Sequence, residues 1–393
     1  MSGDTIVRVA ARGEGVTADG RHAALAAPGD TLTTSGDVIP GPHHQTPPCR
    51  HFPTCGGCQL QHLDDAAYAQ FVTDRIAGAL AAQDLTADIR APILSPPRTR
   101  RRATLHAEPG GGAIRIGFSA AQSHALVDIR ECHILRPELF ALVAPLRKLL
   151  ARLGLKRRGD VHMTWSDQGA DLLVTARAEG LAAAEAIIAF CQQHAVARFA
   201  IDDGLGAETR WEPEPVTITL GGVAVPLPPG SFLQATADGE AALVAAVREA
   251  VGGAGMVADL FAGLGTFALA LDAKVYAAEA ARDAILSLKA ASARAGRAVF
   301  AEHRDLYRRP LTTAELDRFA AIVLDPPRAG AREQAAALAA SQTPVIAYVS
   351  CNPSSFARDA RMLCEGGYRL DWVQPVGQFR WSTHVELAAR FSR

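Results

Sequence analysis

The stretch Pro344-Val-Ile-Ala-Tyr-Val-Ser-Cys-Asn-Pro-Ser-Ser-Phe-Ala-Arg358 decides how the rest of the chain is organised. Residues 345–349 form a short apolar run rich in β-forming side chains, which is typical of a strand covered on both faces of a sheet. Pro353 suits the first turn of a helix, with Asn352 as its cap. Cys351 therefore lies at a strand-to-helix junction, where open α/β sheets place their ligands.

Two interpretations of Cys351 are open at this point. The partial positive charge of a helix N-terminus favours thiolate over thiol, which predicts an activated nucleophile. A single cysteine in a protein is more often a small, buried, apolar residue. The motifs that surround Cys351 favour the nucleophile.

Bulk composition limits the class of protein. The chain has 393 residues, 49% of them hydrophobic, which predicts two or three domains. Its 40 basic and 41 acidic side chains give no overall basic field, so nucleic-acid binding has to rest on local patches. No apolar run is long enough to span a bilayer, and the N-terminus lacks the pattern of a secretory signal. We expect a cytoplasmic protein with no membrane association and no obligatory protein partner.

The first 90 residues contain two segments. Residues 1–40 carry short strand-like runs and glycine turns, which predict a fragment of a small β-barrel. Residues 41–90 begin with a proline-rich linker in which His43 and His44 are expected to be solvated. A capped helix is predicted over Asp64 to Gln83.

Cysteines cluster in the second of these segments. Cys49, Cys55 and Cys58 follow the pattern Cys-x5-Cys-Gly-Gly-Cys, and the two glycines let the backbone wrap tightly around a common centre. Cys132 is the best candidate for a fourth ligand. Four thiolates suit either a 4Fe–4S cluster or a structural zinc ion, and the five-residue gap and distant fourth cysteine favour the cluster. Unligated cysteines are the remaining alternative.

A central α+β domain is predicted over residues 91–230. Strands are expected up to about residue 106 and over 114–130, and a helix over Glu138 to Leu153 with Pro145 awkwardly inside it. The strongest local basic patch of the chain lies at the start of this domain. It either binds RNA phosphates and bases or is a solvated strand edge, and its members are Arg98, Arg100, Arg101 and Arg102.

From residue 231 the pattern changes to regular strand and helix alternation. Strands are predicted over 256–261, 274–278, 299–302 and 321–324, ahead of the 345–349 strand, and Phe267 is predicted to open a helix. These pieces predict an α/β fold with a doubly wound parallel sheet of the Rossmann type, over residues 231–393.

The strand ends of this domain carry the chemistry of a nucleoside site. Asp259-Leu-Phe-Ala-Gly-Leu-Gly-Thr266 is a glycine turn, but Phe267 stands near the place of the third glycine that dinucleotide folds carry. Glu279 can accept hydrogen bonds from both ribose hydroxyls, and Asp305 from an adenine amino group. A glycine turn with two spaced acids is what S-adenosylmethionine binding needs.

A further motif, Asp325-Pro-Pro-Arg328, ends the fourth predicted strand. Two prolines lack amide donors and hold their predecessors extended, so they form a stiff rim suited to a flat base. Asp325 can accept a hydrogen bond from a ring N–H while Cys351 attacks nearby.

Taken together, these motifs resemble the RNA uracil-5-methyltransferase family, and specifically its iron–sulfur branch. The resemblance covers residues 49–393 and includes Phe232-Leu-Gln-Ala235 and His384-Val-Glu386. It implies a class I S-adenosylmethionine-dependent fold, a 4Fe–4S cluster on Cys49, Cys55, Cys58 and Cys132, and 23S ribosomal RNA as substrate, with transfer RNA as the alternative. It also implies that residues 1–40 are a shortened TRAM-type barrel. The cofactor and base pocket implied by the resemblance consists of Gln234, Phe261, Thr266, Glu279, Asp305 and Asp325.

The resemblance implies covalent catalysis. Cys351 corresponds to the nucleophile that adds to carbon-6 of uracil, Glu386 to the base that removes the carbon-5 proton, and Asp325 to a group that orients the ring. The target uridine has to leave the stack for both faces to be accessible. Two other functions stay open: an RNA cytosine-5-methyltransferase, and a non-catalytic iron–sulfur protein that binds RNA or senses redox state.

Overall fold

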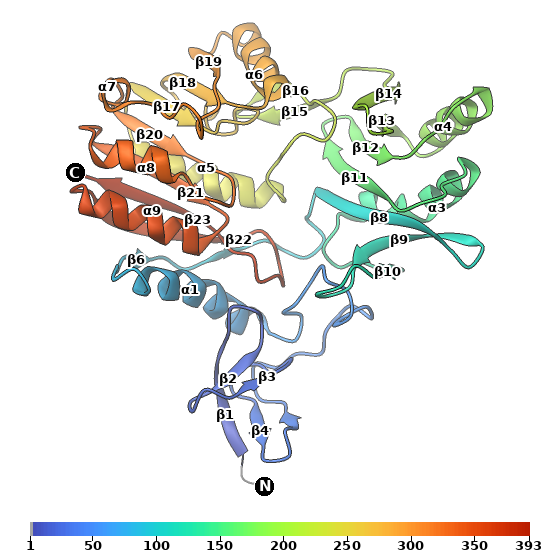
Figure 1. The fold of residues 1–393 in the computed structure, drawn as a ribbon, viewed down its shortest axis with the longest axis horizontal. Helices are drawn as coiled ribbons and strands as arrows, with labels where there is room; N and C mark the ends of the chain where they lie inside the picture. The colour runs from blue at the N-terminus through green and yellow to red at the C-terminus, as the bar shows by residue number, and fades with distance from the viewer. Residues whose placement is uncertain (1–2) are drawn as a thin grey trace.

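One large mixed sheet organises the C-terminal half of the protein in the computed structural model, which describes residues 3–393 (Figure 1). Its parallel part confirms the predicted doubly wound arrangement. In spatial order this part consists of β19 (Val299–His303), β18 (Lys274–Glu279), β17 (Met256–Leu260), β20 (Ala321–Leu324) and β21 (Val345–Ser350).

Beyond β21 the sheet becomes antiparallel, which the sequence patterns did not predict. The strand β23 (Glu386–Ser392) lies between β21 and β22 (Arg369–Gly377) and runs antiparallel to both. The short strands β6 (Asp88–Ile89) and β7 (Ile93–Leu94) pair with the outer side of β22. The sheet is therefore completed by residues that come from before the central domain in the chain.

Helices cover both faces of this sheet, and each face has its own apolar core. One face packs against α1 (Asp65–Ala81), α8 (Arg332–Ala339), α9 (Pro353–Glu365) and the single turn α7 (Thr313–Leu316). The other packs against α5 (Ala237–Val251), α6 (Arg282–Arg294) and a hairpin of β15 (Thr217–Leu220) and β16 (Val223–Pro226). The helix predicted at residues 64–83 is thus part of the layer that covers the large sheet.

The predicted helix at Phe267 is wrong. Residues 263–270 form turns, and the Asp259 carboxylate accepts a hydrogen bond from the backbone N–H of Ala268 at 2.8 Å. Only a few residues separate this turn from Lys274, where the next strand begins. The Ala268 N–H bonds the Asp259 side chain, and the Ala270 N–H bonds the carbonyl of Phe267 three residues back at 2.9 Å, so the segment is a series of turns.

The central domain is built on a seven-stranded sheet with helices on one side (Figure 1). Its strands, in spatial order, are β10 (Leu126–Asp128), β9 (Ala113–Ser119), β8 (Arg102–Gly110), β11 (Gly159–Ser166), β12 (Gly169–Thr175), β13 (Val196–Asp202) and β14 (Ala207–Trp211). Its helices are α2 (Pro137–Ala141), α3 (Val143–Arg152) and α4 (Leu181–Gln193). The single helix predicted over 138–153 is therefore two helices, and the break at Leu142 places Pro145 in a first turn, where its missing N–H costs nothing.

The N-terminal segment forms a separate small lobe at the foot of the molecule in Figure 1. Its five short strands are β1 (Gly3–Val9), β2 (Gly15–Thr17), β3 (His22–Ala23), β4 (Thr31–Thr33) and β5 (Val38–Ile39), ordered β3-β2-β1-β4-β5 around a small apolar core. The prediction of a solvated His44 is wrong, because its Nδ1 lies 2.7 Å from the carboxylate of the fully buried Asp30. This contact attaches the linker to the lobe.

Among residues 3–393, no helix combines the length and the apolar character that crossing a bilayer requires.

Candidate active site

Three strand ends bring Cys351, Asp325 and Glu386 to one edge of the large sheet. The register of β21 against β23 sets the end of the first strand beside the beginning of the second, so Cys351 and Glu386 are neighbours. The strand β20 is parallel to β21, so Asp325 follows it at the same edge. Electrostatic coupling of the Cys351 thiol to both carboxylates reflects this proximity.

Both carboxyl groups hold their protons unusually strongly. Glu386 is 4% exposed, and burial together with the charge of Asp325 raises its pKa to about 8. Burial, and to a smaller extent Glu279, raises the pKa of Asp325 to about 7. Near neutral pH the site therefore exchanges protons readily, as a general acid–base centre requires.

The helix N-terminus is not the only influence on the Cys351 thiol, because burial and groups from other strands act on its pKa as well. Burial is the largest influence, followed by the charges of Glu386 and Asp325, and together they raise the pKa of the thiol to about 11. The guanidinium of Arg328 acts in the opposite direction but does not overcome them. The two carboxylates follow or begin other strands. The sequence around the helix N-terminus therefore gives no sign that they repel a negative charge on the Cys351 sulfur.

The turn after Cys351 confirms the predicted cap and ties it to the proline motif. The Asn352 side chain accepts a hydrogen bond from the Ser354 N–H at 3.2 Å at the start of α9. The Asn352 amide and the Ser355 hydroxyl both donate to the carbonyl of Arg328, at 3.0 and 3.1 Å. The cysteine and the Asp325-Pro-Pro-Arg328 rim are therefore held as one rigid unit.

Gln234 lies at this site as predicted, and it has a partner that the sequence analysis did not identify. Gln234 is 3% exposed, and its Nε2 lies 3.5 Å from Asp325 Oδ2. Its Oε1 accepts a hydrogen bond of 2.7 Å from the amide of Gln378, which is itself 1% exposed. No motif marks Gln378, because its role depends on a contact with a residue 144 positions away.

The glycine turn at the end of β17 has the strained geometry of a close backbone approach. Phe261 has φ +66° and Gly265 has φ +92°. A Cβ on Gly265 would lie 2.4 Å from Leu288, so no larger residue fits there. The Glu279 carboxylate accepts hydrogen bonds from the N–H groups of Gly263 at 2.9 Å and Ala281 at 2.6 Å, which fixes the turn that carries Thr266.

Asp305 lies on the adjoining loop, after β19. Its Oδ1 accepts a hydrogen bond from the N–H of Tyr307 at 3.0 Å. The Tyr307 ring, which the sequence analysis did not identify, lies 5.5 Å from the ring of Phe261 between centroids. The loop therefore contributes an acid and an aromatic surface next to the glycine turn.

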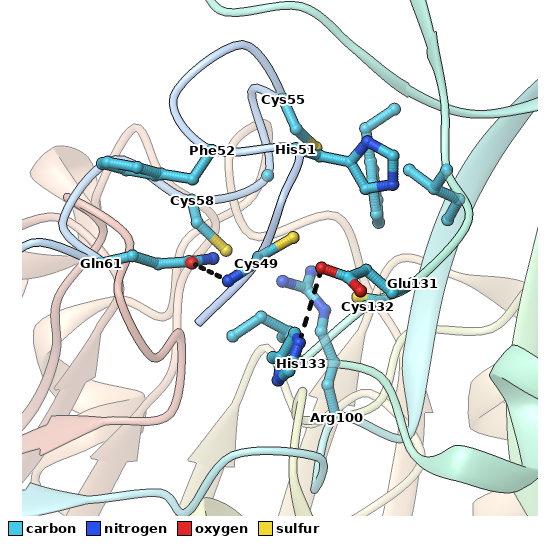
Figure 2. A pocket seen from close by; sticks show the side chains of 14 residues that line it. Cys49, His51, Phe52, Cys55, Cys58, Gln61, Arg100, Glu131, Cys132 and His133 are labelled. Atoms are coloured by element: carbon cyan, nitrogen blue, oxygen red, sulfur yellow. Dashed lines mark hydrogen bonds and ion pairs between the residues drawn. The ribbon is translucent and has the colours of Figure 1, made fainter. Parts of the chain in front are cut away.

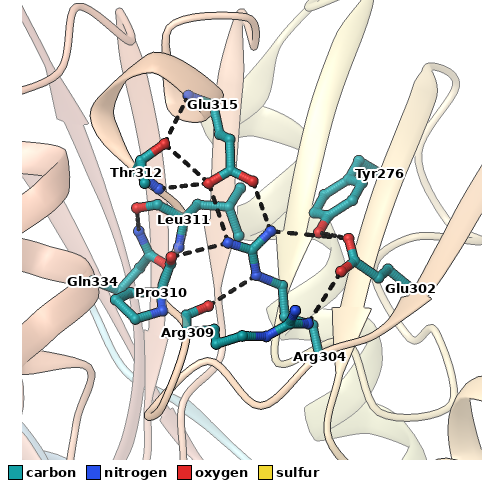
Figure 3. A network of polar contacts seen from close by, with 9 residues as sticks. All are labelled: Tyr276, Glu302, Arg304, Arg309, Pro310, Leu311, Thr312, Glu315 and Gln334. Atoms are coloured by element: carbon teal, nitrogen blue, oxygen red, sulfur yellow. Dashed lines mark hydrogen bonds and ion pairs between the residues drawn. The ribbon is translucent and has the colours of Figure 1, made fainter.

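Arg304 anchors that loop, as Figure 3 shows. Its guanidinium pairs with the Glu315 carboxylate at 2.7 Å and donates to the carbonyls of Arg309 at 2.8 Å and Pro310 at 3.0 Å. Hydrogen bonds from Arg304 and Thr312 lower the pKa of Glu315 to about 2. This network holds both ends of the segment that carries Asp305 and Tyr307.

The four predicted ligand cysteines line one cavity (Figure 2). Cys49, Cys55 and Cys58 come from the loop before α1, and Cys132 comes from the central domain. All four thiols are free, and burial, followed by smaller contributions that include the three other cysteines, raises the pKa of Cys58 to about 12.

The cavity wall has features that suit sulfur ligands. Cys132 Sγ accepts a hydrogen bond from the backbone N–H of Leu135 at 3.5 Å, which is how proteins stabilise ligating thiolates. A Cβ on Gly56 would lie 2.7 Å from the Ser119 carbonyl, so a glycine is needed for the two segments to approach. Within residues 3–393, no group of His, Cys, Asp and Glu side chains is arranged to hold a single metal ion. The four thiols together are the donor set that either a 4Fe–4S cluster or a structural zinc ion uses.

The structure does not bring the four predicted RNA-binding arginines together. Arg98 is exposed, whereas Arg100 lines the cysteine cavity and lies over the Phe379 ring at 5.3 Å. Arg101 is 6% exposed and forms a buried ion pair of 2.6 Å with Glu240, so it has no surface to offer a phosphate.

The fourth of these arginines lies at the candidate active site. Arg102 lies 4.6 Å from the centroid of the Phe232 ring, and its charge acts on Glu386. Phe232 itself is 60% exposed. An exposed aromatic ring backed by a guanidinium is a surface on which a base can stack.

Comparisons with known proteins agree with this geometry. Residues 227–393 match the model of the tRNA (uracil-5-)-methyltransferase family. An uncharacterised RNA methyltransferase of Zymomonas mobilis is 52% identical over 99% of both chains. The 23S rRNA (uracil(1939)-C(5))-methyltransferase RlmD of Chromohalobacter salexigens is 34% identical, over 90% of this chain and 77% of its own length.

The fold has a counterpart among solved structures. The crystal structure of the tRNA (uracil-54, C5)-methyltransferase of Pyrococcus abyssi, in complex with S-adenosyl-L-homocysteine, has a TM-score of 0.77 over 99% of both chains at 22% identity. This match extends over the N-terminal lobe and central domain as well as the large sheet. On the strength of the sequence relatives and the shared fold, the chain belongs to the RNA uracil-5-methyltransferase family.

Proposed function

We propose that this protein transfers a methyl group from S-adenosylmethionine to carbon-5 of a uridine in 23S ribosomal RNA. The observation that carries the proposal is the placement of Cys351 between two carboxyl groups of raised pKa, Asp325 and Glu386, at the carboxyl edge of the sheet. The 34% identical relative named for a 23S rRNA uracil supports the choice of RNA.

The nucleophile and base follow from the needs of the substrate. Carbon-5 of uracil becomes nucleophilic when the Cys351 sulfur bonds to carbon-6 and leaves an enolate. S-adenosylmethionine supplies the methyl group that this carbon takes. Glu386 then accepts the carbon-5 proton, the ring double bond re-forms, and the sulfur–carbon bond breaks. A Glu386 pKa of about 8 suits a group that both takes and releases a proton near neutral pH.

Formation of the thiolate depends on filling the site. The free thiol has its pKa raised to about 11 partly by the charges of Glu386 and Asp325. Protonation of either carboxyl group, or a positive charge brought in beside them, removes that repulsion. We infer that Cys351 stays a protected thiol in the resting protein and loses its proton when RNA and methyl donor are bound.

The remaining pocket residues have distinct proposed tasks. The strained turn with Phe261 and Thr266, and the acids Glu279 and Asp305, hold the methyl donor. Asp325 accepts a hydrogen bond from the ring N–H of uracil, and Phe232 stacks on a flipped base. Three of the four arginines remain proposed RNA contacts, namely Arg98, Arg100 and Arg102. The buried Arg101 is no longer proposed as one.

The cysteine cavity is proposed to hold a 4Fe–4S cluster. Cys49, Cys55, Cys58 and Cys132 would be its ligands, and the cluster would join the loop before α1 to the central domain. Iron and sulfide analysis of anaerobically purified protein tests this, with a fourfold Cys→Ser variant as the blank. Zinc without iron in the purified protein would contradict it.

The methyl-transfer proposal is tested by trapping the adduct. Wild-type protein is incubated with S-adenosylmethionine and a 23S transcript that contains 5-fluorouridine, which has no removable carbon-5 proton. We expect a denaturation-resistant complex whose cross-linked peptide contains Cys351. Cys351→Ala should not form it, and Cys364→Ala, a change on the helix α9, should. Methylation of cytidine instead of uridine in the mapped product would favour the cytosine alternative.

A further inference from the structure

The side-chain amide of Gln378 has a single possible orientation. Its Oε1 accepts a hydrogen bond from the backbone N–H of Ala235 at 2.9 Å. A backbone N–H can only donate, so the oxygen of Gln378 must point toward Ala235 and its nitrogen away from it. The nitrogen donates to Gln234 Oε1 at 2.7 Å, and the amide also lowers the pKa of Glu386, against the larger effect of burial. The oxygen and the nitrogen of this buried amide therefore both have hydrogen-bond partners.

The orientation of Gln378 determines that of Gln234 in turn. Gln234 Oε1 receives the hydrogen bond from Gln378, so its Nε2 is the end that faces Asp325, 3.5 Å from Oδ2. A donor beside Asp325 requires Oδ2 to act as an acceptor, and it favours the ionised carboxylate, in which Oδ1 is an acceptor as well. The two amides thus lie between Glu386 and Asp325. Gln378 donates to Gln234, and Gln234 presents its N–H to Asp325.

The surrounding structure packs closely against this pair. Gly239 lies in the first turn of α5, next to Gln378. A Cβ at position 239 would lie 2.7 Å from Gln378 Cβ, so the close contact requires glycine. Arg101 Nε donates to the carbonyl of Gln234 at 3.2 Å, and its guanidinium is fixed by the buried pair with Glu240. Helix α5 therefore packs against Gln378, and Arg101, the residue before β8, holds the backbone of Gln234.

We propose that Gln378 is a positioning residue that fixes Asp325 as a hydrogen-bond acceptor and thereby selects uracil over cytosine. Uracil presents a donor at N3, and cytosine presents an acceptor at the same position. An acceptor at Asp325 pairs with the first and repels the second. The inference rests on the proposed function, because it assigns the ring contact to Asp325.

The decisive variant is Gln378→Glu. A carboxylate cannot donate to Gln234 Oε1, so the Gln234 amide must turn and present its oxygen to Asp325. Asp325 then has to keep a proton on Oδ2, and its ionised form, in which both oxygens accept, is no longer stabilised. We expect the preference for uridine over cytidine in kcat/KM to fall by about tenfold or more, because a mismatched buried polar group is what carries such discrimination.

A second variant, Gln378→Met, keeps the shape of the side chain and removes its polar atoms. We expect kcat/KM on uridine RNA to fall by about 100-fold, the usual effect of lost positioning. The rising limb of its pH profile should move to higher pH, because the hydrogen bond from Gln378 favours ionised Glu386. The charged and titratable groups that face Glu386 are Asp325, Arg102 and Cys351, and they are unchanged in this variant.

Gln374→Met is the matched control, because Gln374 is a buried glutamine of β22, four residues before Gln378, whose amide bonds the carbonyl of Ala91 instead. The target uridine is first mapped with wild-type protein, and two transcripts that differ only in U or C there are then compared. Wild-type protein that makes no 5-methyluridine would reject the proposed function. Active wild-type protein with unchanged selectivity in Gln378→Glu would reject only this inference. If Gln378→Glu does not fold, the pH profile of Gln378→Met decides. A rising limb at the same pH as in wild type and Gln374→Met would reject the inference.

Discussion

The backbone N–H of Gln59 donates a hydrogen bond of 2.8 Å to the carbonyl of Trp381. Gln59 directly follows Cys58, one of the four cavity cysteines, and Trp381 lies in the loop between β22 and Glu386. The N–H of Leu60 donates to the same carbonyl at 2.9 Å. The cysteine loop and the loop that presents the candidate base are therefore joined directly.

We predict that disturbing the cysteine cavity loosens the loop of residues 378–385. Cys58→Ser should increase amide hydrogen exchange in that loop while leaving the central strands of the large sheet protected, because local opening does not require global unfolding. Mass spectrometry of exchanged peptides measures this. Cys364→Ser serves as the control, and equal exchange in both variants would show that the two loops are energetically independent.

The raised pKa of Glu386 makes a stability prediction as well as a catalytic one. Because the pKa is about 8 in the folded protein and near 4.5 in the unfolded chain, folding is favoured by the protonated form. The contribution of protonated Glu386 to the free energy of unfolding is fully present below pH 4.5 and is lost as pH rises to about 8. Glu386→Gln removes this dependence and should unfold at higher urea concentration than wild type at pH 8, by a free energy of roughly 2 kcal/mol or more. Turnover should be lost at the same time.

The measurement is a set of urea unfolding curves from pH 5 to pH 9. The difference between Glu386→Gln and wild type should grow with pH through this interval and level off above the folded pKa. A constant difference would mean that Glu386 is ionised in the folded protein throughout, and that its proposed pKa is wrong.

A contrast between two arginines tests the assignment of the basic patch. Arg101→Ala leaves Glu240 buried without its partner, which should cost about 3–5 kcal/mol of unfolding free energy. Arg98→Ala changes an exposed side chain and should alter stability by less than about 0.5 kcal/mol. Denaturant unfolding separates the two, and similar losses in both variants would contradict the distinction.

Arg304 is predicted to support the methyl-donor site through the loop it anchors. Arg304→Leu breaks the pair with Glu315 and frees the segment that carries Asp305 and Tyr307. We expect the Kd for S-adenosylhomocysteine, measured by calorimetry, to rise by about tenfold, equivalent to roughly 1.4 kcal/mol.

Arg308→Ala is the control for this change, because the side chain of Arg308 is 87% exposed and pairs with Asp305 only at the surface. Its Kd should stay within a factor of about two. Equal weakening in both variants would place the effect in the charge of the loop and not in its anchorage.

Local signals explain which features of this protein could be predicted from sequence. The strand before Cys351, its Asn352 cap and Pro353 are adjacent in the chain, and the structure confirms all three. The arginines at 98–102 are adjacent too, but adjacency misleads there, because successive residues of an extended chain point in different directions. Each of these arginines consequently meets a different part of the molecule.

The features that sequence reasoning missed depend on distant contacts. The high pKa of the Cys351 thiol comes from burial and from carboxylates on two other strands. Gln378 matters because of Gln234 and Glu386, and the hydrophobic pattern of β22 gives no sign of that. Good helix formers such as Ala268 and Leu269 follow Gly265, but the Ala268 N–H bonds the carboxylate of Asp259, which the local pattern does not show.

The placement of β23 between two antiparallel neighbours constrains how this enzyme can change. A slip of one residue in that strand would turn Glu386 to the opposite face of the sheet and away from Cys351. Insertions between β22 and β23 can be absorbed in the loop, but an insertion within β23 would shift its register against both neighbours. Length variation among functional variants should therefore accumulate before residue 386 and be absent within the strand that follows.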